Sequence, residues 1–294
     1  MVMTTPAAVT WNEADVTERG WYLYGITLSE PLAPVLAAAD AGHPLGAGVA
    51  DDMADAARLQ LLDCSGLVAV VRPVPLADFS QAVLQDRLRS ASDLEAIVRN
   101  HNHVIETIHA RQAILPAKFG SVYARAEDLV AALRSSCDVL MPRLRRVDGC
   151  DEWAVHVYAD RVLIRERICT ENHSILRLRD ECSKATPGRA YFLQQQLRSD
   201  LRAATDDALG ALAKSVFDRL AGHAVAAQTN AVGPIDDAAD ETEILRASFL
   251  VTREVVERFE EQVRASDTWD GVRSEATGPW PPYSFAVPHD EVTA

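Results

Sequence analysis

The sequence predicts an α+β protein of two domains, in which the C-terminal domain has a ferredoxin-like fold and the N-terminal domain is a smaller α+β unit. Two observations support the C-terminal assignment: elements after residue 149 follow the order β-α-β-β-α-β, and both helices in that order have a strong apolar period. This order predicts an antiparallel four-stranded sheet with the helices on one face. In the first half, strands precede helices, which fits an α+β unit of undetermined topology.

The N-terminal elements start at Trp21–Leu28, where aromatic and β-branched residues predict a strand. Two apolar runs flank Ser65-Gly66 and predict a tight hairpin, and Pro73 and Pro75 are expected to end its second strand. Apolar residues at helical spacing predict helices over 93–112 and 126–147, with Pro142 kinking or splitting the latter. The segment between them, AILPAKFGSVYA, is predicted to be extended.

The C-terminal elements follow a turn at Asp148-Gly149, where we place the domain boundary. The helix signal is clearest at Thr186-Pro187, which suits the N-cap and first position of a helix reaching about residue 220. Residues 160–184 are charged and only weakly helical in pattern. Strands are expected at 152–159, 224–232, 243–252 and 271–277, and a further helix at 253–265. The predicted organisation is a flexible leader (1–19), an N-terminal domain (20–148) containing a long loop at 29–57, a ferredoxin-like domain (149–278) and a C-terminal tail (279–294).

Composition narrows the classes of partner. The 294 residues are 48% apolar and 24% charged, which is typical of a globular protein, and the net charge is −14. Nucleic acids and anionic membranes are recognised through basic surfaces, so neither is expected to be a partner. The sequence has no apolar run of about 18 residues and no recognisable secretory signal at its start. A cytoplasmic location is therefore expected.

No pattern in the sequence requires catalysis, a cofactor or a metal. The five cysteines are widely spaced without a C-x-x-C pair, which favours free thiols over a zinc site. His101 and His103 of the HNH stretch would point in different directions from a helix, and His109 lies two turns further along. A G-x-S-x-G elbow, a phosphate-binding loop and a G-x-G-x-x-G fingerprint are all missing. We therefore expect no catalytic, cofactor-binding or metal-binding residues.

Two short stretches are unusual. In LPAKFG, Lys118 is a lone cation in an apolar run, and it is either a side chain that reaches solvent from a strand edge or a buried, paired interaction residue. In TGPWPPYSF, three prolines surround Trp280 and stiffen the chain, which lowers the entropic cost of docking the aromatic residues. We expect this segment to dock back on its own chain, with Trp280 largely buried.

Four segments together resemble the L/F-type (GvpL/GvpF) gas vesicle protein family: WYLYGIT, ILPAKFGSVY, GRAYFL and TGPWPPYSF, in that order. The resemblance implies a non-enzymatic accessory or minor structural protein that binds the major shell protein, works with other gas vesicle accessory proteins, and assists nucleation and assembly of the vesicle. It also implies a gas vesicle location and a fold of two α+β domains. The motif residues, with structural or partner-contact roles, are Lys118, Phe119, Gly120, Gly188, Tyr191, Gly278, Pro279, Trp280, Pro281, Pro282, Tyr283 and Phe285.

Two other classes of function stay open at this point. The chain could be an enzyme or small-ligand-binding ferredoxin-like protein of unknown substrate, because ferredoxin-like domains host many functions. A deep polar pocket with perturbed carboxylates or histidines would favour that class. An RNA-binding sheet face is the third possibility, but the chain lacks both the basic charge and the aromatic strand pattern that this mode uses.

Overall fold

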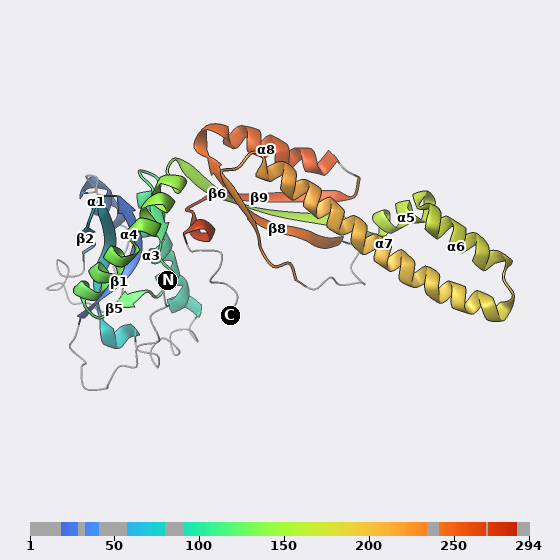
Figure 1. Ribbon diagram of the computed structural model, residues 1–294. Helices are drawn as coiled ribbons and strands as arrows, with labels where there is room; N and C mark the ends of the chain where they lie inside the picture. Colours follow the sequence, from blue (N-terminus) through green and yellow to red (C-terminus); the bar gives the residue numbers. More distant parts are fainter. Residues whose placement is uncertain are drawn as a thin grey trace. The chain divides into compact units, whose positions relative to one another are not determined.

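The computed structural model describes residues 19–28, 33–40, 58–79, 91–233, 241–268 and 270–286. The chain is a mixed α/β protein with two separate sheets (Figure 1). It divides into two compact units, of which unit 1 comprises Met1–Cys150 with Trp280–Ala294 and unit 2 comprises Asp151–Pro279. The predicted leader (1–19, apart from Arg19) and most of the predicted loop (29–57) lie outside the described residues.

The sheet of unit 1 is built around its first strand, β1, as the apolar pattern predicts. The strand order is β2-β3-β1-β4, and β5 also pairs with β1. Ser65 and Gly66 both have positive φ, at 55° and 84°, which confirms the predicted tight turn between β2 and β3. The strands are β1 (Arg19–Leu28), β2 (Gln60–Cys64), β3 (Leu67–Pro75), β4 (Ile114–Pro116) and β5 (Val122–Tyr123).

Strand β3 ends at Pro75, as expected, but it continues through Pro73, so the expected end at Pro73 is wrong. The pairing registers give the reason. Strand β2 pairs with β3 only as far as Val71, whereas β1 continues alongside β3 and places Trp21 opposite Pro73. Beyond Val71 one edge of β3 has no β2 partner, and a proline without an N–H can occupy such an edge.

Helices cover both faces of this sheet. All residues from Leu67 to Val71 are buried, as expected for a strand packed on both faces. Helix α4 contacts β1, β2 and β3 and is unbroken at Pro142, so the predicted split does not occur. The helical elements of unit 1 are α1 (Ala33–Asp40), η3 (Leu76–Phe79), α3 (Ala91–His109), α4 (Ala126–Val147) and η6 (Tyr283–Phe285). One core cluster contains Tyr22, Tyr24, Val68, Val70, Val74, Val104, Ile105, Ile108 and Ile114.

The sheet of unit 2 has one apolar face and one polar face. Val155 and Val157 of β6 are fully buried, while His156 and Tyr158 between them are partly exposed, as strand alternation requires. Helices α7 and α8 pack on the apolar face (Figure 1). The strand order is β7-β8-β6-β9. The strands are β6 (Cys150–Asp160), β7 (Ala226–Thr229), β8 (Glu241–Thr252) and β9 (Val272–Trp280), and after β8 come η4 (Arg253–Val255), α8 (Val256–Arg264) and η5 (Ala265–Thr268).

Three helices connect β6 to β7, although the sequence predicted only weak helical character for the first two. They are α5 (Arg161–Glu171), α6 (His173–Lys184) and α7 (Pro187–Ala221). The side chains of Asp160 and Asn172 cap α5 and α6 by accepting bonds from Leu163, Ser174 and Ile175 backbone N–H groups. The C-terminal part of α7 lies on the sheet, and its N-terminal part pairs with α5 and α6 (Figure 1). We call residues 161–204 the helical arm; Ile175 is its one buried side chain.

Candidate functional site

Residues 117–120 (AKFG, within the LPAKFG stretch) form a loop of unit 1. A series of hydrogen bonds to strand β1 and helix α3 fixes the backbone of this loop. The backbone N–H of Gly120 donates to Tyr22 Oη at 3.2 Å, and Tyr22 Oη lies 2.9 Å from Nδ1 of His101. The His101 ring also bonds the backbone of Ala117, and the Ala117 N–H donates to the Tyr24 carbonyl at 2.9 Å. Strand β1 and helix α3 thus hold both ends of residues 117–120.

Burial sets the charge state of this network. His101 is only 4% exposed, and desolvation lowers its pKa to about 4, although the bond with the Ala117 backbone acts in the opposite direction. Burial likewise raises the pKa of Tyr22 far above its usual value, against the bond from the Gly120 backbone. Both groups are therefore neutral near pH 7. The Tyr22 hydroxyl thus accepts from Gly120 and shares a second hydrogen bond with Nδ1 of His101.

The two side chains at the centre of the loop point outward. Lys118 is exposed, which agrees with a lysine that reaches solvent and excludes the buried, paired alternative. Phe119 is 41% exposed, and its ring meets the edge of His101 at a centroid distance of 5.6 Å. Gly120 has φ 80°, a left-handed conformation that glycine adopts without strain.

The proline-rich segment returns to unit 1. Pro281 and Pro282 are buried, and Tyr283 packs against the core cluster while its hydroxyl donates to Asn102 Oδ1 at 3.0 Å. Arg143 of α4 donates to the carbonyl of Ala286 at 3.4 Å. We call residues 281–286 the C-terminal strap; it joins α3, β4 and α4 of the same unit.

The expected burial of Trp280 is wrong, because its side chain is 44% exposed. The reason is that β9 extends through Trp280, so that docking begins only at Pro281. Pro279 is also exposed, and Phe285 is half-buried. Gly278 has a packing role within unit 2: a Cβ there would lie 2.9 Å from the Trp153 ring and 3.0 Å from the Glu152 carbonyl.

Replacing Tyr283 with phenylalanine is expected to lower the free energy of unfolding by about 1 kcal/mol, because one partly buried hydrogen bond is lost. The bond is the one from Tyr283 to Asn102. Urea unfolding of Tyr283→Phe, Asn102→Ala and the double variant would measure it. If the two single effects add in full, the strap is not held by this bond.

The GRAYFL motif lies in unit 2, in the first two turns of α7. Tyr191 is 60% exposed and Phe192 is 73% exposed, and their rings meet edge to face at 5.8 Å. Gly188 is exposed, and a Cβ there would meet nothing within 4 Å. The predicted motif residues therefore fall into two groups: Lys118, Phe119, Gly120 and the strap in unit 1, and Gly188 and Tyr191 on the arm.

Sequence reasoning missed three residues of these surfaces. The sequence pattern marks Tyr22 only as a strand residue and His101 only as a poorly placed metal ligand, whereas together they hold the loop. Phe192 was left out although it has the most exposed large apolar side chain among the residues described. A signal existed for Phe192, because it lies off the helical stripe of Leu193 and Leu197.

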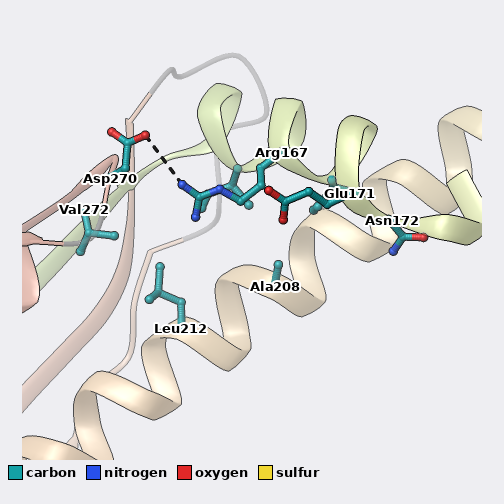
Figure 2. Close-up of a pocket in the computed structure, with 9 residues that line it drawn as sticks. Arg167, Glu171, Asn172, Ala208, Leu212, Asp270 and Val272 are labelled. Carbon is teal, nitrogen blue, oxygen red and sulfur yellow. Dashed lines mark ion pairs between the residues drawn. The ribbon is translucent and has the colours of Figure 1, made fainter. Parts of the chain in front are cut away.

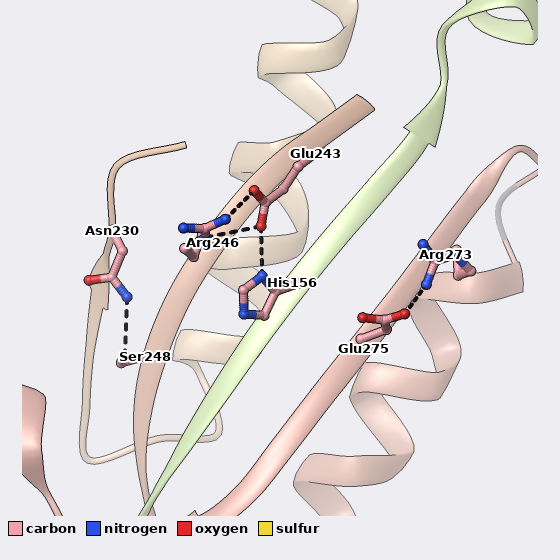
Figure 3. A network of polar contacts seen from close by, with 7 residues as sticks. All are labelled: His156, Asn230, Glu243, Arg246, Ser248, Arg273 and Glu275. Atoms are coloured by element: carbon pink, nitrogen blue, oxygen red, sulfur yellow. Dashed lines mark hydrogen bonds and ion pairs between the residues drawn. The ribbon is translucent and has the colours of Figure 1, made fainter. Parts of the chain in front are cut away.

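The polar face of the unit 2 sheet is occupied by pairs within the face (Figure 3). His156 Nδ1 lies 2.6 Å from Glu243, and Arg246 also binds Glu243, at 2.7 Å. Burial works to raise the pKa of Glu243, but the bonds from Arg246 and His156 outweigh it and hold the pKa below its usual value. Arg273 binds Glu241 and Glu275 in the same way. A phosphate would have to displace carboxylates from these arginines, which disfavours nucleic acid on this face.

A hollow of about 450 Å³ lies at the root of the helical arm, between α5, α7 and the start of β9 (Figure 2). Its polar rim includes Arg167 and Asp270, which form an exposed ion pair at 3.7 Å, together with Glu171 and Asn172. The other lining residues are apolar: Ile164, Ile168, Ala208, Leu212 and Val272. Neither rim carboxylate is buried, so the hollow does not enclose an acid away from solvent.

Two searches of the described residues complete the picture of the surface. Among them, no cluster of three or more His, Cys, Asp or Glu side chains is placed to hold a metal ion. None of the helices in the described part of the chain has the length and apolarity to cross a membrane.

A family model tests the resemblance that the four motifs suggest. The model described as gas vesicle synthesis protein GvpL/GvpF matches residues 20–287, which is most of the chain. The chain belongs to the GvpL/GvpF family. The resemblance inferred from the four motifs is thereby confirmed, and a gas vesicle association follows from it.

Curated relatives agree with this assignment. Gas vesicle protein L of Streptomyces sp. (strain CB03234) is 29% identical over 274 residues, covering 92% of this chain and 94% of that protein. Gas vesicle protein L2 of Halobacterium salinarum is 26% identical over 67% of this chain and 74% of its own length. Gas vesicle protein F of the same Streptomyces strain is 27% identical over 63% of this chain and 75% of its own length.

Solved structures share the fold. The crystal structure of GvpF from Anabaena sp. PCC7120 matches with a TM-score of 0.61 at 19% identity, covering 92% of this chain and 99% of that one. GvpF from Microcystis aeruginosa matches with a TM-score of 0.55 at 18% identity over the same shares. The mixed α/β architecture expected from the sequence is therefore that of the GvpF structures.

Proposed function

We propose that this member of the GvpL/GvpF family is a non-enzymatic accessory or minor structural protein of gas vesicles, which binds the major shell protein and assists nucleation and assembly of the vesicle. The family match over residues 20–287 carries the proposal. The exposed aromatic side chain of Phe119 adds to it, because the buried His101 ring supports it from behind. Such side chains suit contacts with an apolar partner.

The motif residues divide into two proposed roles. Lys118 and Phe119 contact the partner, because the loop presents them outward while its backbone is held by Tyr22 and His101. The second role is structural: the residues with this role set the backbone conformation or hold the strap against unit 1. They are Gly120, Gly278, Pro279, Pro281, Pro282, Tyr283 and Phe285. We also propose other gas vesicle accessory proteins as partners, and a cytoplasmic site of action.

We infer in addition that unit 2 is a ferredoxin-like domain. The strand order β7-β8-β6-β9 supports this, since a β-α-β-β-α-β chain wound in this way places its first and third strands in the centre. The two helices α7 and α8 on one face agree with it. The domain limits that we propose remain 20–148 and 149–278, with the tail from 279 docking back.

The proposed partner contact can be tested with purified major shell protein from the same gas vesicle cluster. Full-length chain is expected to retain the shell protein on affinity resin, and Phe119→Ser is expected to weaken binding about tenfold, as for loss of an aromatic anchor. Val139→Ser serves as the matched control, because Val139 is 51% exposed on α4 and should leave binding unchanged.

Two results would count against the proposal. Failure of the full-length chain to bind shell protein, alone or with the other accessory proteins, would remove the proposed function. If Phe119→Ser bound the shell protein as tightly as the unaltered chain, the loop would not be the contact site, but the proposed function would stand. The hollow at the arm root gives little support to the alternative of a ligand-binding or enzymatic protein. Its polar rim is exposed to solvent, and Arg167 and Asp270 on that rim already bind each other.

A further inference from the structure

We propose that the protein self-associates head to tail, with Tyr191 and Phe192 of one copy inserted into the arm-root hollow of a second copy. The inference concerns surfaces of unit 2 alone. It does not depend on binding of the shell protein.

The inserting group is the aromatic pair at the tip of the helical arm. Tyr191 and Phe192 lie within the first two turns of α7, and both are more exposed than any other large apolar side chain among the described residues. Their edge-to-face contact at 5.8 Å makes them one apolar projection rather than two independent side chains. Exposed Arg189 lies three positions before Phe192, so the two residues are neighbours on the helix surface.

The receiving group is the hollow whose lining residues Figure 2 shows. Its floor consists of aliphatic side chains from α5, α7 and β9, and its volume of about 450 Å³ is within the range that holds a pair of rings. Glu171 and Asp270 outnumber Arg167 on its rim, so the rim is acidic by one charge. Arg189 would therefore approach a carboxylate when the rings enter.

The arm is basic, whereas a stretch of the chain that ends at the hollow is acidic. Residues 173–204, the part of the arm beyond the hollow, hold six Arg or Lys against three Asp or Glu, although the whole chain has a net charge of −14. The stretch Asp236–Asp270, which ends at the rim of the hollow, holds eleven acids and four arginines. A basic arm on an acidic protein is attracted to the body of another copy and steered towards it.

Helix geometry excludes insertion of the tip into the hollow of its own chain. Tyr191 and Ala208 lie seventeen positions apart on one continuous helix, which separates tip and hollow by about 25 Å. An unbroken helix cannot fold the tip back into its own root. Each copy then offers one tip and one hollow, and contacts of this heterologous kind extend into chains of copies. The buried area is small, so association is weak and depends on concentration.

Sedimentation velocity of the purified full chain over a range of concentrations tests the proposal. Dimers and longer species are expected at low salt and are expected to dissociate at high salt. The double variant Tyr191→Ser/Phe192→Ser is expected to lower the association constant at least about tenfold. Ala208→Tyr fills the hollow and is expected to do the same, while Ala203→Tyr, an exposed position about 140° round α7, should have no effect.

Mixing the tip variant with the hollow variant tests directly whether a tip binds the hollow of another copy. The tip variant keeps its hollow and the Ala208→Tyr variant keeps its tip, so each alone should be monomeric while an equimolar mixture forms dimers and nothing longer. Circular dichroism of each variant checks that α7 is folded. A full chain that stays monomeric at low salt, a tip variant that associates normally, or a mixture without dimers would each overturn the proposal.

Discussion

Replacing Gly25 with alanine is expected to lower the free energy of unfolding by about 3 kcal/mol, near the upper end of what overpacking costs. A Cβ at this position would lie 2.8 Å from the Leu115 carbonyl oxygen and 2.8 Å from Ile114 Cδ1. Real Cβ atoms do not approach so closely, and the oxygen belongs to a strand backbone. Strand β4 would therefore have to move away from β1.

The displacement has a local consequence as well. Gly25 pairs with Pro116, the last residue of β4 before the loop that presents Lys118 and Phe119. Movement of β4 should loosen that loop together with the sheet. Urea unfolding measures the loss of stability, and amide exchange at Gly120, which donates to Tyr22, reports the loop.

Gly210 provides the matched control for Gly25. It lies inside α7, is exposed, and a Cβ there would meet nothing within 4 Å. Gly210→Ala is expected to raise the free energy of unfolding by about 0.5–1 kcal/mol, because alanine favours a helix over the unfolded chain. If Gly25→Ala were as harmless as Gly210→Ala, the close approach of β4 to β1 would not limit stability.

Lowering the pH from 7 to 4 is expected to cost about 3 kcal/mol of stability through His101 alone. In the unfolded chain this histidine takes up a proton near pH 6.5, whereas burial lowers its pKa in the folded protein to about 4. Between these values the unfolded state binds more protons than the folded state. The stabilisation is therefore complete above pH 6.5 and is lost as the pH falls to 4.

The variant His101→Gln isolates this effect from the carboxylates that also titrate in acid. Glutamine does not titrate, so its stability should fall by about 3 kcal/mol less than that of the unaltered chain between pH 7 and pH 4. Denaturant unfolding at several pH values gives both curves. Parallel curves would show that His101 can be protonated in the folded protein, and that the contact with Tyr22 and Ala117 tolerates the charge.

Most elements could be predicted because local patterns and tertiary packing agree. The tight turn at Ser65-Gly66 and the 126–147 helix follow from turn chemistry and apolar spacing alone, and both occur as expected. The expected strand end at Pro73 failed because it depended on a neighbouring strand. Pro73 is tolerated where β2 stops pairing with β3, and no local pattern reports where a partner strand ends.

The candidate surfaces were predicted less completely than the fold. Motif residues such as Lys118 and Tyr191 can be recognised in the sequence. The residues that hold the Lys118 loop in place cannot. Tyr22 and His101 are 79 positions apart, and only the folded chain shows that they hold the same loop. Trp280 was misjudged for a related reason: an aromatic residue between prolines looks like a buried anchor, whereas Tyr283 three residues later makes the contact.

The path of the chain bears on how the protein is made. Unit 2 is inserted between the main part of unit 1 and the C-terminal strap, so residues 281–286 leave the ribosome after all other described elements. Synthesis adds roughly 5–20 residues per second, which leaves unit 1 without its strap for several seconds after its last helix has emerged. During that interval the part of the core cluster against which Tyr283 later packs lacks this cover. Unit 1 can therefore acquire its strap only after all of unit 2 has been synthesised.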